Sequence, residues 1–559
     1  MSGGIGGVPP EQEDPRADLI WGTVPRLVED AAERHGGTEA LVDGDLRLTY
    51  AQLAPEVDRY ARGFAAAGVG AGERVAMWAP NCAEWMLAAL GALRAGAVLV
   101  PLNTRFKGGE AAYIVRNAGV PTLVTVRGFL GTDYPALLAG EDTGALTRVV
   151  VLRDEGDAGP GPDGVPVVAL GELLRAGDGV DPAVTADRAA AVRPGDVSDL
   201  IFTSGTTGHP KGAVASHAQT LRTFGTWSSI VGLRAGDRYL VVNPFFHTFG
   251  YKAGILACLM AGATVVPEPV FDATKVMARI EAERISVLPG PPTLYQTLLA
   301  DPRRSEHDLS SLRLGVTGAA VVPVELGEAM GDERGFDTVL TAYGLTEACG
   351  TVTMCRRSDP PGVVSATSGR AIPGLEVRAV AEGREVPTGE PGEIVVRGYT
   401  VMSGYWGNEE ATAEAIDPEG WLHTGDIGVM DAAGNVTITD RVKDMYVVGG
   451  FNAYPAEIEA ILRGHEAVAQ VAVVGIPDER MGEVGCAYVV PAHPAPDPDE
   501  LGRAILGWSR GSMANYKVPR SVVLVDTLPV NASGKVLKRE LRERHAAGVD
   551  HVVTNERSE

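Results

Sequence analysis

The sequence predicts an α/β fold with parallel-rich sheets, divided between a large N-terminal domain and a small C-terminal α+β domain. Its 559 residues are too many for one hydrophobic core, so we expect roughly two to four domains or subdomains. Up to about residue 340, short apolar segments alternate with helical patterns, which is typical of parallel strands joined by helices. Between about residues 370 and 440, short strands separated by turn residues dominate, and a smaller α/β pattern follows.

The first helix–strand units illustrate the alternation. Residues 49–69 carry apolar side chains at helical spacing behind Thr49, a residue type that favours helix N-caps. The strand RVAMWA (74–79), the helix AEWMLAALGALRAG (83–96) and the strand AVLVPL (97–102) follow. Later apolar segments predict further strands at 237–243, 263–268 and 285–290.

The remaining patterns set the domain boundaries. LEVRAV, GEIVVRG and NVTITD predict a small β-barrel-like subdomain at about 370–440, within an N-terminal domain of residues 21–440. Residues 441–545 contain the helices and strands of the C-terminal domain. Polar and turn-forming residues predict a disordered lead-in at 1–20 and a frayed tail at 546–559.

Composition restricts the classes of partner. The chain has 72 acidic and 49 basic residues and a formal charge of −23, which disfavours nucleic acid and anionic membrane surfaces. No segment reaches the ~20 apolar residues that span a bilayer, and the N-terminus lacks a signal-peptide pattern. The five cysteines form no C-x-x-C pair, as expected for free thiols. We therefore expect a cytoplasmic protein.

The segment TSGTTGHPKG (203–212) has the composition of a phosphate-binding loop. Glycines let backbone N–H groups approach an anion, hydroxyls donate hydrogen bonds, and Lys211 adds a positive charge. It is not a Walker P-loop, because Pro210 stands where the second glycine is required and Gly212 follows the lysine. The segment predicts phosphate binding by a different kind of loop.

Five further segments accompany this loop: NPFFHTFG (243–250), AYGLTEACG (342–350), GWLHTGDIG (420–428), TDRVKDMYVVGGFNAYPAEIE (439–459) and LPVNASGK (528–535). In this order and spacing the six motifs resemble the adenylate-forming superfamily, over roughly residues 25–545. That superfamily includes acyl-CoA synthetases, adenylation domains of nonribosomal peptide synthetases and beetle luciferases.

The resemblance implies a reaction in two steps. A carboxylate attacks the α-phosphorus of ATP, giving an acyl-adenylate and pyrophosphate, and a thiol such as that of coenzyme A then takes the acyl group. This chemistry needs cations, N–H donors and Mg²⁺ to stabilise phosphoryl charge, but no strong base. The expected cofactors are ATP, Mg²⁺ and coenzyme A.

The resemblance also implies roles for individual residues. Lys211 holds phosphates, Thr346 contacts the α-phosphate, Glu347 binds Mg²⁺, His247 is a gate near the carboxylate, and Lys535 bridges the carboxylate and the α-phosphate. The expected nucleotide and coenzyme A contacts are Thr203, Ser204, Gly205, Thr206 (also at the metal), Thr207, Gly208, Gly318, Ala319, Ala320, Ala342, Tyr343, Gly344, Asp426, Arg441, Gly449 and Gly450. The expected acid-binding residues are His247, Phe249, Tyr251, Gly344 and Leu345.

The two steps imply a mobile C-terminal domain. Lys443 occupies the hinge position of the superfamily, and rotation there would exchange Lys535 for the Gly449–Gly450 segment at the site. A homodimer is a further possibility that superfamily membership raises.

The acid and the acceptor are less defined. A chain without a following carrier domain favours coenzyme A as acceptor. The segments NPFFHTFGYKAGILACL and VLPGPPTLYQTLL resemble actinobacterial acyl-CoA synthetases of steroid degradation, which act on a hexahydroindanedione propionate. Lys252 is then either a ligand for ring ketones or a surface or supporting cation. The alternatives are an adenylating enzyme that serves a carrier protein or another nucleophile, including nitrite activation for diazotisation, and a nucleotide-binding protein without catalysis.

Overall fold

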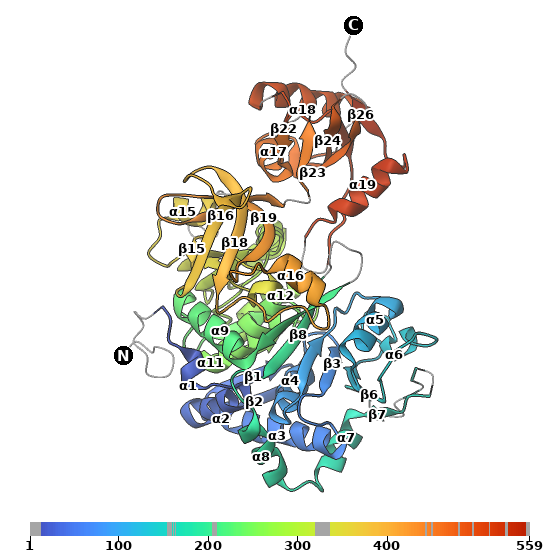
Figure 1. Ribbon diagram of the computed structural model, residues 1–559, viewed down its shortest axis with the longest axis vertical. Coiled ribbons are helices and arrows are strands. Elements are labelled where there is room, and N and C mark those ends of the chain that lie inside the picture. Colours follow the sequence, from blue (N-terminus) through green and yellow to red (C-terminus); the bar gives the residue numbers. More distant parts are fainter. Residues whose placement is uncertain are drawn as a thin grey trace. The chain divides into compact units, whose positions relative to one another are not determined.

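The computed structural model describes residues 13–153, 159, 161–162, 164–203, 210–318, 336–441, 444–448, 451–478, 481–494, 497–513, 515–531 and 535–554. The chain forms two compact units (Figure 1). Unit 1 contains Met1–Glu376 and Val396–Leu422, and unit 2 contains Val377–Val395 and His423–Glu559. The predicted domain boundary at 440/441 stays a prediction.

A seven-stranded sheet forms one half of unit 1. Its strand order is β7-β6-β5-β3-β4-β8-β9, and every neighbouring pair is parallel except the terminal hairpin β8–β9. The strands are β3 (Arg74–Trp78), β4 (Val98–Pro101), β5 (Thr122–Thr125), β6 (Arg148–Val151), β7 (Val167–Ala169), β8 (Val197–Thr203) and β9 (Lys211–Ser216). The accompanying helices are α3 (Tyr50–Ala66), α4 (Ala83–Arg94), α5 (Gly108–Ala118), α6 (Tyr134–Leu137), α7 (Leu170–Gly177) and α8 (Pro182–Ala191).

Local sequence explains how the α3–α4 pair forms. Thr49 caps α3, and a capping box joins it to Gln52, which fixes the predicted helix start. Gly91 lets the two helices approach closely, because a Cβ there would lie 2.5 Å from Cβ of Tyr60. The helices predicted at 49–69 and 83–96 and the strands at 74–79 and 97–102 are confirmed within a few residues.

The other half of unit 1 is built on two short strand groups, β10-β11-β1-β2 and β12-β13-β14-β15. The predicted strand 285–290 lies between the two groups and connects them. Val287 bridges Tyr239 and Leu314, and Leu288 and Gly290 donate their N–H groups to the carbonyls of Leu314 and Val316, each at 3.0 Å. The strands are β1 (Glu39–Asp43), β2 (Leu46–Thr49), β10 (Arg238–Val241), β11 (Thr264–Pro267), β12 (Leu314–Gly318), β13 (Thr338–Tyr343), β14 (Thr353–Met354) and β15 (Arg370–Ala371).

The helical segments of this half include a six-residue π-helix, η2 (Tyr251–Leu256). The α-helices are α1 (Ala17–Ile20), α2 (Val24–His35), α9 (His217–Val231), α10 (Thr248–Gly250), α11 (Ala257–Ala261), α12 (Ala273–Glu283), α13 (Pro292–Ala300), α15 (Pro361–Ala366) and α16 (Glu409–Ala415). Two 3₁₀ turns are η3 (Pro302–Glu306) and η4 (Thr346–Ala348).

Two further sheets follow. The five-stranded sheet has the order β17-β16-β18-β19-β20, with β16 (Leu375–Ala381), β17 (Arg384–Glu385), β18 (Pro391–Gly398), β19 (Leu422–Met430) and β20 (Val436–Arg441). It lies in the region where a β-rich subdomain is predicted.

The six-stranded sheet of unit 2 has the order β22-β21-β24-β25-β26, and β23 pairs with β24. Gly475 and Gly485 leave room for the buried ring of Tyr446. The strands are β21 (Tyr446–Val448), β22 (Phe451–Ala453), β23 (Val468–Asp478), β24 (Gly482–Pro491), β25 (Ser521–Leu524) and β26 (Val552–Thr554), with helices α17 (Pro455–Leu462), α18 (Pro498–Ser512) and α19 (Lys538–Ala546).

Both predicted disordered ends contain ordered residues. Within the lead-in, residues 17–20 form α1, because Ala17 finds a buried place against α9. Within the tail, β26 pairs with β25 and Val553 is buried. Isolated apolar residues in a polar segment gave no periodic pattern from which these contacts could be predicted.

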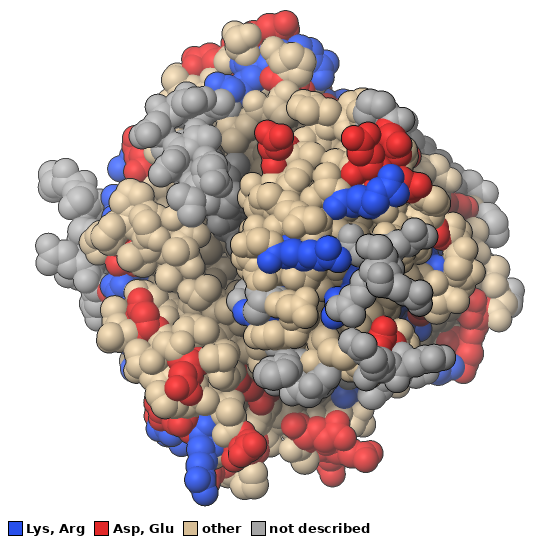
Figure 2. All heavy atoms as spheres, turned by 90° about the horizontal axis from the view of Figure 1, so that it is seen from above, with Lys and Arg blue, Asp and Glu red and all other residues tan. Residues whose placement is uncertain are grey.

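One face of the molecule carries charges of both signs (Figure 2). On the face that Figure 2 shows, basic and acidic side chains are interspersed and no continuous basic area is visible among the residues drawn in colour. Among the described residues, no helix is long and apolar enough to cross a membrane.

Candidate functional site

The ends of the TSGTTGHPKG segment are fixed by the β8–β9 hairpin. Thr203, the last residue of β8, pairs with Lys211, the first residue of β9. The predicted phosphate-loop residues between them, Ser204, Gly205, Thr206, Thr207 and Gly208, lie outside the described residues. The hairpin therefore places Thr203 and Lys211 side by side at the base of the predicted phosphate loop.

A tight turn after β13 presents Glu347. The chain leaves β13 at Tyr343, makes the 3₁₀ turn η4 and reverses at Cys349, whose φ is 54°. Gly344 is required here, because a Cβ would lie 2.2 Å from the carbonyl oxygen of Gly350. The turn holds the Glu347 side chain at the carboxyl end of a strand, where ligands of α/β sheets bind.

Four side chains from three segments form what we name the Glu347 cluster: Thr203, Lys211, Glu347 and Tyr405. Oε1 of Glu347 accepts hydrogen bonds from the Thr203 hydroxyl at 3.1 Å and from the Tyr405 hydroxyl at 3.0 Å. The Lys211 ammonium lies 5.3 Å from the centre of the Tyr405 ring, within cation–π range. The structure thus brings three predicted site residues together around a tyrosine.

Tyr405 is a functional candidate that the sequence analysis missed. Its segment joins the outer edge of β9: Trp406 donates its N–H to the Gly212 carbonyl at 2.8 Å, and Val214 donates to the Gly404 carbonyl at 3.1 Å. The sequence SGYWG reads as a turn with aromatic residues and gives no local signal of a partner almost 200 residues earlier. Only the tertiary pairing identifies it.

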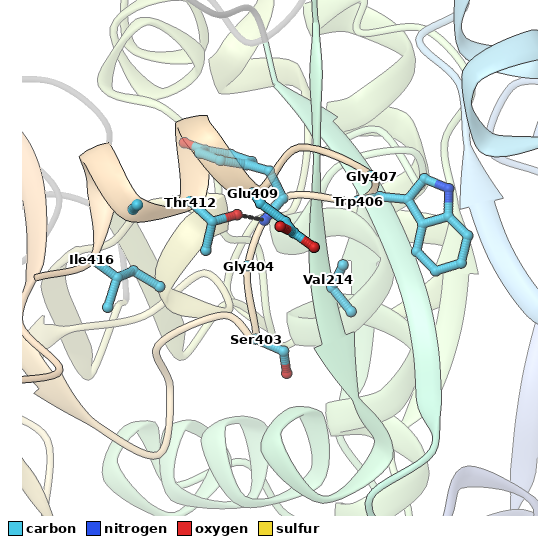
Figure 3. A pocket seen from close by; sticks show the side chains of 10 residues that line it. Val214, Ser403, Gly404, Trp406, Gly407, Glu409, Thr412 and Ile416 are labelled. Carbon is cyan, nitrogen blue, oxygen red and sulfur yellow. Dashed lines mark hydrogen bonds between the residues drawn. The ribbon is translucent and has the colours of Figure 1, made fainter. Parts of the chain in front are cut away.

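A hollow of about 530 Å³ lies next to this segment, as Figure 3 shows. From its far side, the Thr412 hydroxyl accepts the N–H of Tyr405 at 2.9 Å. The Tyr405 backbone is therefore held both by β9 and by α16. The hollow is lined by Val214, Ser403, Gly404, Tyr405, Trp406, Gly407, Glu409, Thr412, Ala413 and Ile416.

Two neighbouring parallel strands carry several of the predicted nucleotide contacts. Gly318 ends β12 and pairs in register with Ala342 of β13, directly before Tyr343. A Cβ at Gly318 would lie 2.4 Å from the Ala342 carbonyl oxygen, so only glycine fits. Tyr343, Leu345 and Thr346 are partly exposed beyond this edge. The predicted contacts Ala319 and Ala320 lie outside the described residues.

His247 sits at the start of α10 with a defined tautomer. Its Nδ1 accepts the N–H of Phe249 at 3.2 Å, so the neutral ring carries its proton on Nε2. The ring is solvent-accessible, yet the protein around it lowers its pKa from 6.5 through desolvation. His247 is therefore an exposed residue whose ring is neutral near pH 7.

The two aromatic residues that follow His247 differ in exposure. Phe249 is half-buried, whereas the predicted acid-binding residue Tyr251 is fully buried with its ring 5.9 Å from that of Trp85.

Lys252 is a buried supporting cation. Its ammonium lies 2.8 Å from Oδ1 of Asp199, and both side chains are 1% exposed. It also donates to the hydroxyl of Thr220 at 3.1 Å and to the sulfur of Cys349 at 3.5 Å. Of the interpretations of Lys252, the surface cation is wrong, and a ketone ligand does not fit an ammonium already held by these three partners.

The predicted nucleotide contacts Asp426, Arg441 and Lys535 lie in unit 2. Asp426 is buried in β19 and pairs in register with Arg441 of β20. Lys535 is exposed in a turn in which its N–H donates to the Asn531 side chain at 2.9 Å. The predicted hinge Lys443 and the Gly449–Gly450 segment lie outside the described residues.

A magnesium ion fits the donor set at Glu347. Both hydrogen bonds fall on Oε1, and within the described part of the chain Oε2 accepts none. No group of three or more His, Cys, Asp or Glu side chains among the described residues could hold a metal. A single free carboxylate oxygen suits Mg²⁺, which takes few protein ligands and completes its shell with phosphate and water.

Comparison with known proteins agrees with this geometry. Residues 28–406 match the family described as AMP-binding enzyme, and residues 457–535 match the AMP-binding enzyme C-terminal domain. A relative from Rhodococcus jostii (strain RHA1), named a 3-(7a-methyl-1,5-dioxo-octahydro-1H-inden-4-yl)propanoyl:CoA ligase, is 50% identical over 93% of this chain and 98% of its own length. A ligase of the same name from Mycobacterium tuberculosis is 48% identical over 93% of this chain and 98% of its own length.

A solved structure extends the likeness to the whole fold. The anthranilate CoA ligase AuaEII in complex with anthranoyl-AMP superimposes with a TM-score of 0.85 and 29% identity, covering 96% of this chain and 99% of that one. The predicted α/β fold class and the resemblance to adenylate-forming enzymes are both confirmed. The chain belongs to the AMP-binding enzyme family.

Proposed function

We propose that the chain is an ATP-dependent, AMP-forming acyl-CoA ligase. It would join a carboxylic acid to ATP as an acyl-adenylate with release of pyrophosphate, and then transfer the acyl group to the thiol of coenzyme A. The observation that carries this proposal is the 50% identity to a CoA ligase over 93% of the chain. The Glu347 cluster supports it, because it gathers a cation, a carboxylate and hydroxyl groups at the base of the predicted phosphate loop.

The residues of unit 1 divide the work of the first step. Lys211 would stabilise the negative charge of the phosphates, and Thr346 would orient the α-phosphate. Oε2 of Glu347 would hold Mg²⁺, which when bound neutralises phosphate charge. Tyr343 would stack on adenine above the Gly318–Ala342 strand edge.

The residues of unit 2 would complete the site. The Asp426 carboxylate would accept hydrogen bonds from the ribose hydroxyls, and Arg441 would contact the nucleotide. Lys535 would bridge the substrate carboxylate and the α-phosphate. Rotation about Lys443 would then bring Gly449 and Gly450 toward the pantetheine arm of coenzyme A. The Asn531 side chain accepts the backbone N–H of Lys535, so the backbone is fixed while the residue stays exposed. An exposed lysine on a fixed backbone is compatible with this role.

His247 would act as a neutral wall beside the substrate carboxylate. The acid is already ionised near pH 7, so its oxygen needs no general base. A histidine with a lowered pKa stays uncharged and does not form an ion pair that would have to break before the carboxylate attacks. Nε2–H remains available to donate a hydrogen bond to the carboxylate.

The acid we propose is a bicyclic ring-bearing propionate of steroid origin. The support is the name shared by two relatives that cover 93% of the chain at 50% and 48% identity. A cytoplasmic location and a homodimer stay predictions, and light scattering after gel filtration tests the second.

The decisive experiment measures AMP and thioester formation from ATP and Mg²⁺. The acids are the 7a-methyl-1,5-dioxo-octahydroindenyl propionate, fatty acids of graded length, aryl acids, and nitrite with an aryl amine, each with and without coenzyme A. A thioester with the bicyclic acid, dependent on coenzyme A, is the expected result. AMP formation that ignores coenzyme A, or that occurs only with nitrite and an amine, would keep adenylation and overturn the ligase assignment.

A further inference from the structure

Tyr405 contacts both charged members of the Glu347 cluster. Its hydroxyl donates to Oε1 of Glu347 at 3.0 Å, and its ring faces the Lys211 ammonium at 5.3 Å. No direct ion pair joins Lys211 to Glu347 in the part of the chain that the structure describes. The phenol thus lies where two opposite charges would otherwise be free to meet.

The position of Tyr405 is fixed by its backbone. Residues 403–406 are bound to β9 by main-chain hydrogen bonds, and Thr412 accepts the N–H of Tyr405. The phenol hydroxyl donates a hydrogen bond to Glu347, a role that only the neutral phenol can fill. A rigid neutral donor between two charges holds each without neutralising either.

A direct Lys211–Glu347 pair would compete with the nucleotide. Two opposite charges in contact satisfy each other, and binding of phosphate and Mg²⁺ would first have to separate them. Holding the charges apart before the ligand arrives is a form of preorganisation, which improves binding by removing that cost. This consequence distinguishes positioning from packing, because packing needs the ring but not the hydroxyl.

We propose that Tyr405 is a positioning residue of the ATP site: its hydroxyl holds one oxygen of Glu347 and leaves the other for Mg²⁺, while its ring keeps Lys211 available for phosphate. The proposal rests on the proposed function, since it assigns Mg²⁺ and phosphate to these two residues. It adds a residue outside all six motifs and gives each half of the side chain a separate task.

The test separates the two tasks by substitution. Tyr405→Phe removes the hydroxyl and keeps the ring, so the Mg²⁺ concentration for half-maximal activity is expected to rise about tenfold, as for loss of one hydrogen bond to a charged group. Tyr405→Leu removes the ring as well, so the KM for ATP is expected to rise further. The KM for the acid should change less than twofold in both variants.

The matched control is Tyr134→Phe in the same unit. Its hydroxyl donates to the Thr104 carbonyl at 2.9 Å, so this variant also loses one tyrosine hydrogen bond, but away from the cluster. It should leave the Mg²⁺ and ATP dependence unchanged. Circular dichroism and thermal melting would show that all three variants are folded.

Calorimetric titration of ATP into each variant at several Mg²⁺ concentrations provides a readout without turnover. Weaker Mg²⁺-dependent ATP binding in Tyr405→Phe, with the control at wild-type affinity, supports the proposal even if none of the acids tested is a substrate. Unchanged Mg²⁺ dependence in Tyr405→Phe, or an equal loss in Tyr134→Phe, overturns it. Failure of the wild-type chain to bind ATP with Mg²⁺ overturns both this proposal and the proposed function, whereas ATP binding without thioester formation contradicts only the latter.

Discussion

Unit 1 contains two clusters in which a lysine lies near a carboxylate, and they are built in opposite ways although both include residues of β8 and of the turn after β13. The Glu347 cluster joins β8 to the turn after β13 and is half-buried. The second cluster, which we name the Lys252 cluster, joins the same segments through Ser198, Asp199, Thr220, Lys252 and Cys349 and is fully buried. In the first the charges are held apart by a phenol, and in the second they touch at 2.8 Å.

The difference indicates which charges serve a ligand. A buried charge must be paired, because the free-energy cost of removing an unpaired charge from water is far larger than the gain from a single hydrogen bond. The paired charges of Asp199 and Lys252 are therefore committed to the fold. Within the described part of unit 1, Lys211 and Glu347 form no direct ion pair, and such charges are tolerated only where water can reach them. This arrangement leaves Lys211 for phosphate and Glu347 for the metal.

The largest expected effect breaks the buried pair. Lys252→Met leaves Asp199 buried without its cation, so the free energy of unfolding of this unit should fall by about 3–5 kcal/mol. Denaturant unfolding followed by tryptophan fluorescence measures the loss. Lys275→Met, an exposed lysine on α12, is the control and should change stability by less than about 0.5 kcal/mol.

The next effect separates activity from stability in the other cluster. Glu347→Gln keeps the side-chain shape but removes the charge, so kcat/KM should fall about 100-fold or more while the melting temperature stays within a few degrees. Steady-state AMP formation and thermal melting are measured on the same preparation. A large stability loss with little loss of activity would assign Glu347 to the fold instead.

His217 is a further buried ionisable residue of unit 1, and unlike Asp199 and Lys252 it is buried in its neutral form. Burial lowers its pKa from 6.5 to about 4, and its Nδ1 accepts the N–H of Val24 at 3.3 Å. The unfolded chain takes up the proton first, so stability is lost as the pH falls from 6.5 toward 4, by at most about 3 kcal/mol. In His217→Asn, stability should depend less steeply on pH across this window, whereas the exposed His493→Asn should follow the wild type.

The smallest effect comes from removing both buried charges together. In Lys252→Met combined with Asp199→Leu no ion is left unpaired, so stability should return to within about 1 kcal/mol of the wild type. Comparison of this double variant with both single variants in one unfolding series gives the coupling. Additive losses would show that the two side chains act independently.

The sequence predicted those features that rest on local patterns. The Thr49 cap, the strands around Val75 and Leu99 and the motif carrying Glu347 each follow from neighbouring residues. The Asp199–Lys252 pair does not, because a charged residue in an apolar stretch gives no sign of a partner 53 residues away. The sequence analysis missed Tyr405 for the same reason. Its position depends on the pairing of its segment with β9, and the residues near it give no signal of that pairing.

The ordered ends of the chain show the same limit. Val552–Thr554 pairs with β25 because that edge is available in the folded unit. The apolar segment 285–290, by contrast, was predicted as a strand from its composition and does pair with β10 and β12. At the C-terminal end, tertiary pairing therefore decided against the local pattern.

The attachment of residues 403–406 to β9 has a consequence for handling the protein. β9 is the last strand of the seven-stranded sheet, and an uncovered last strand is a template for strands of other molecules. The hydrogen bonds to Gly212 and Val214 occupy that edge. Substitutions that detach the segment, such as proline at Trp406, should therefore promote aggregation as well as disturb Tyr405, and low yield and low activity in such variants would share one origin.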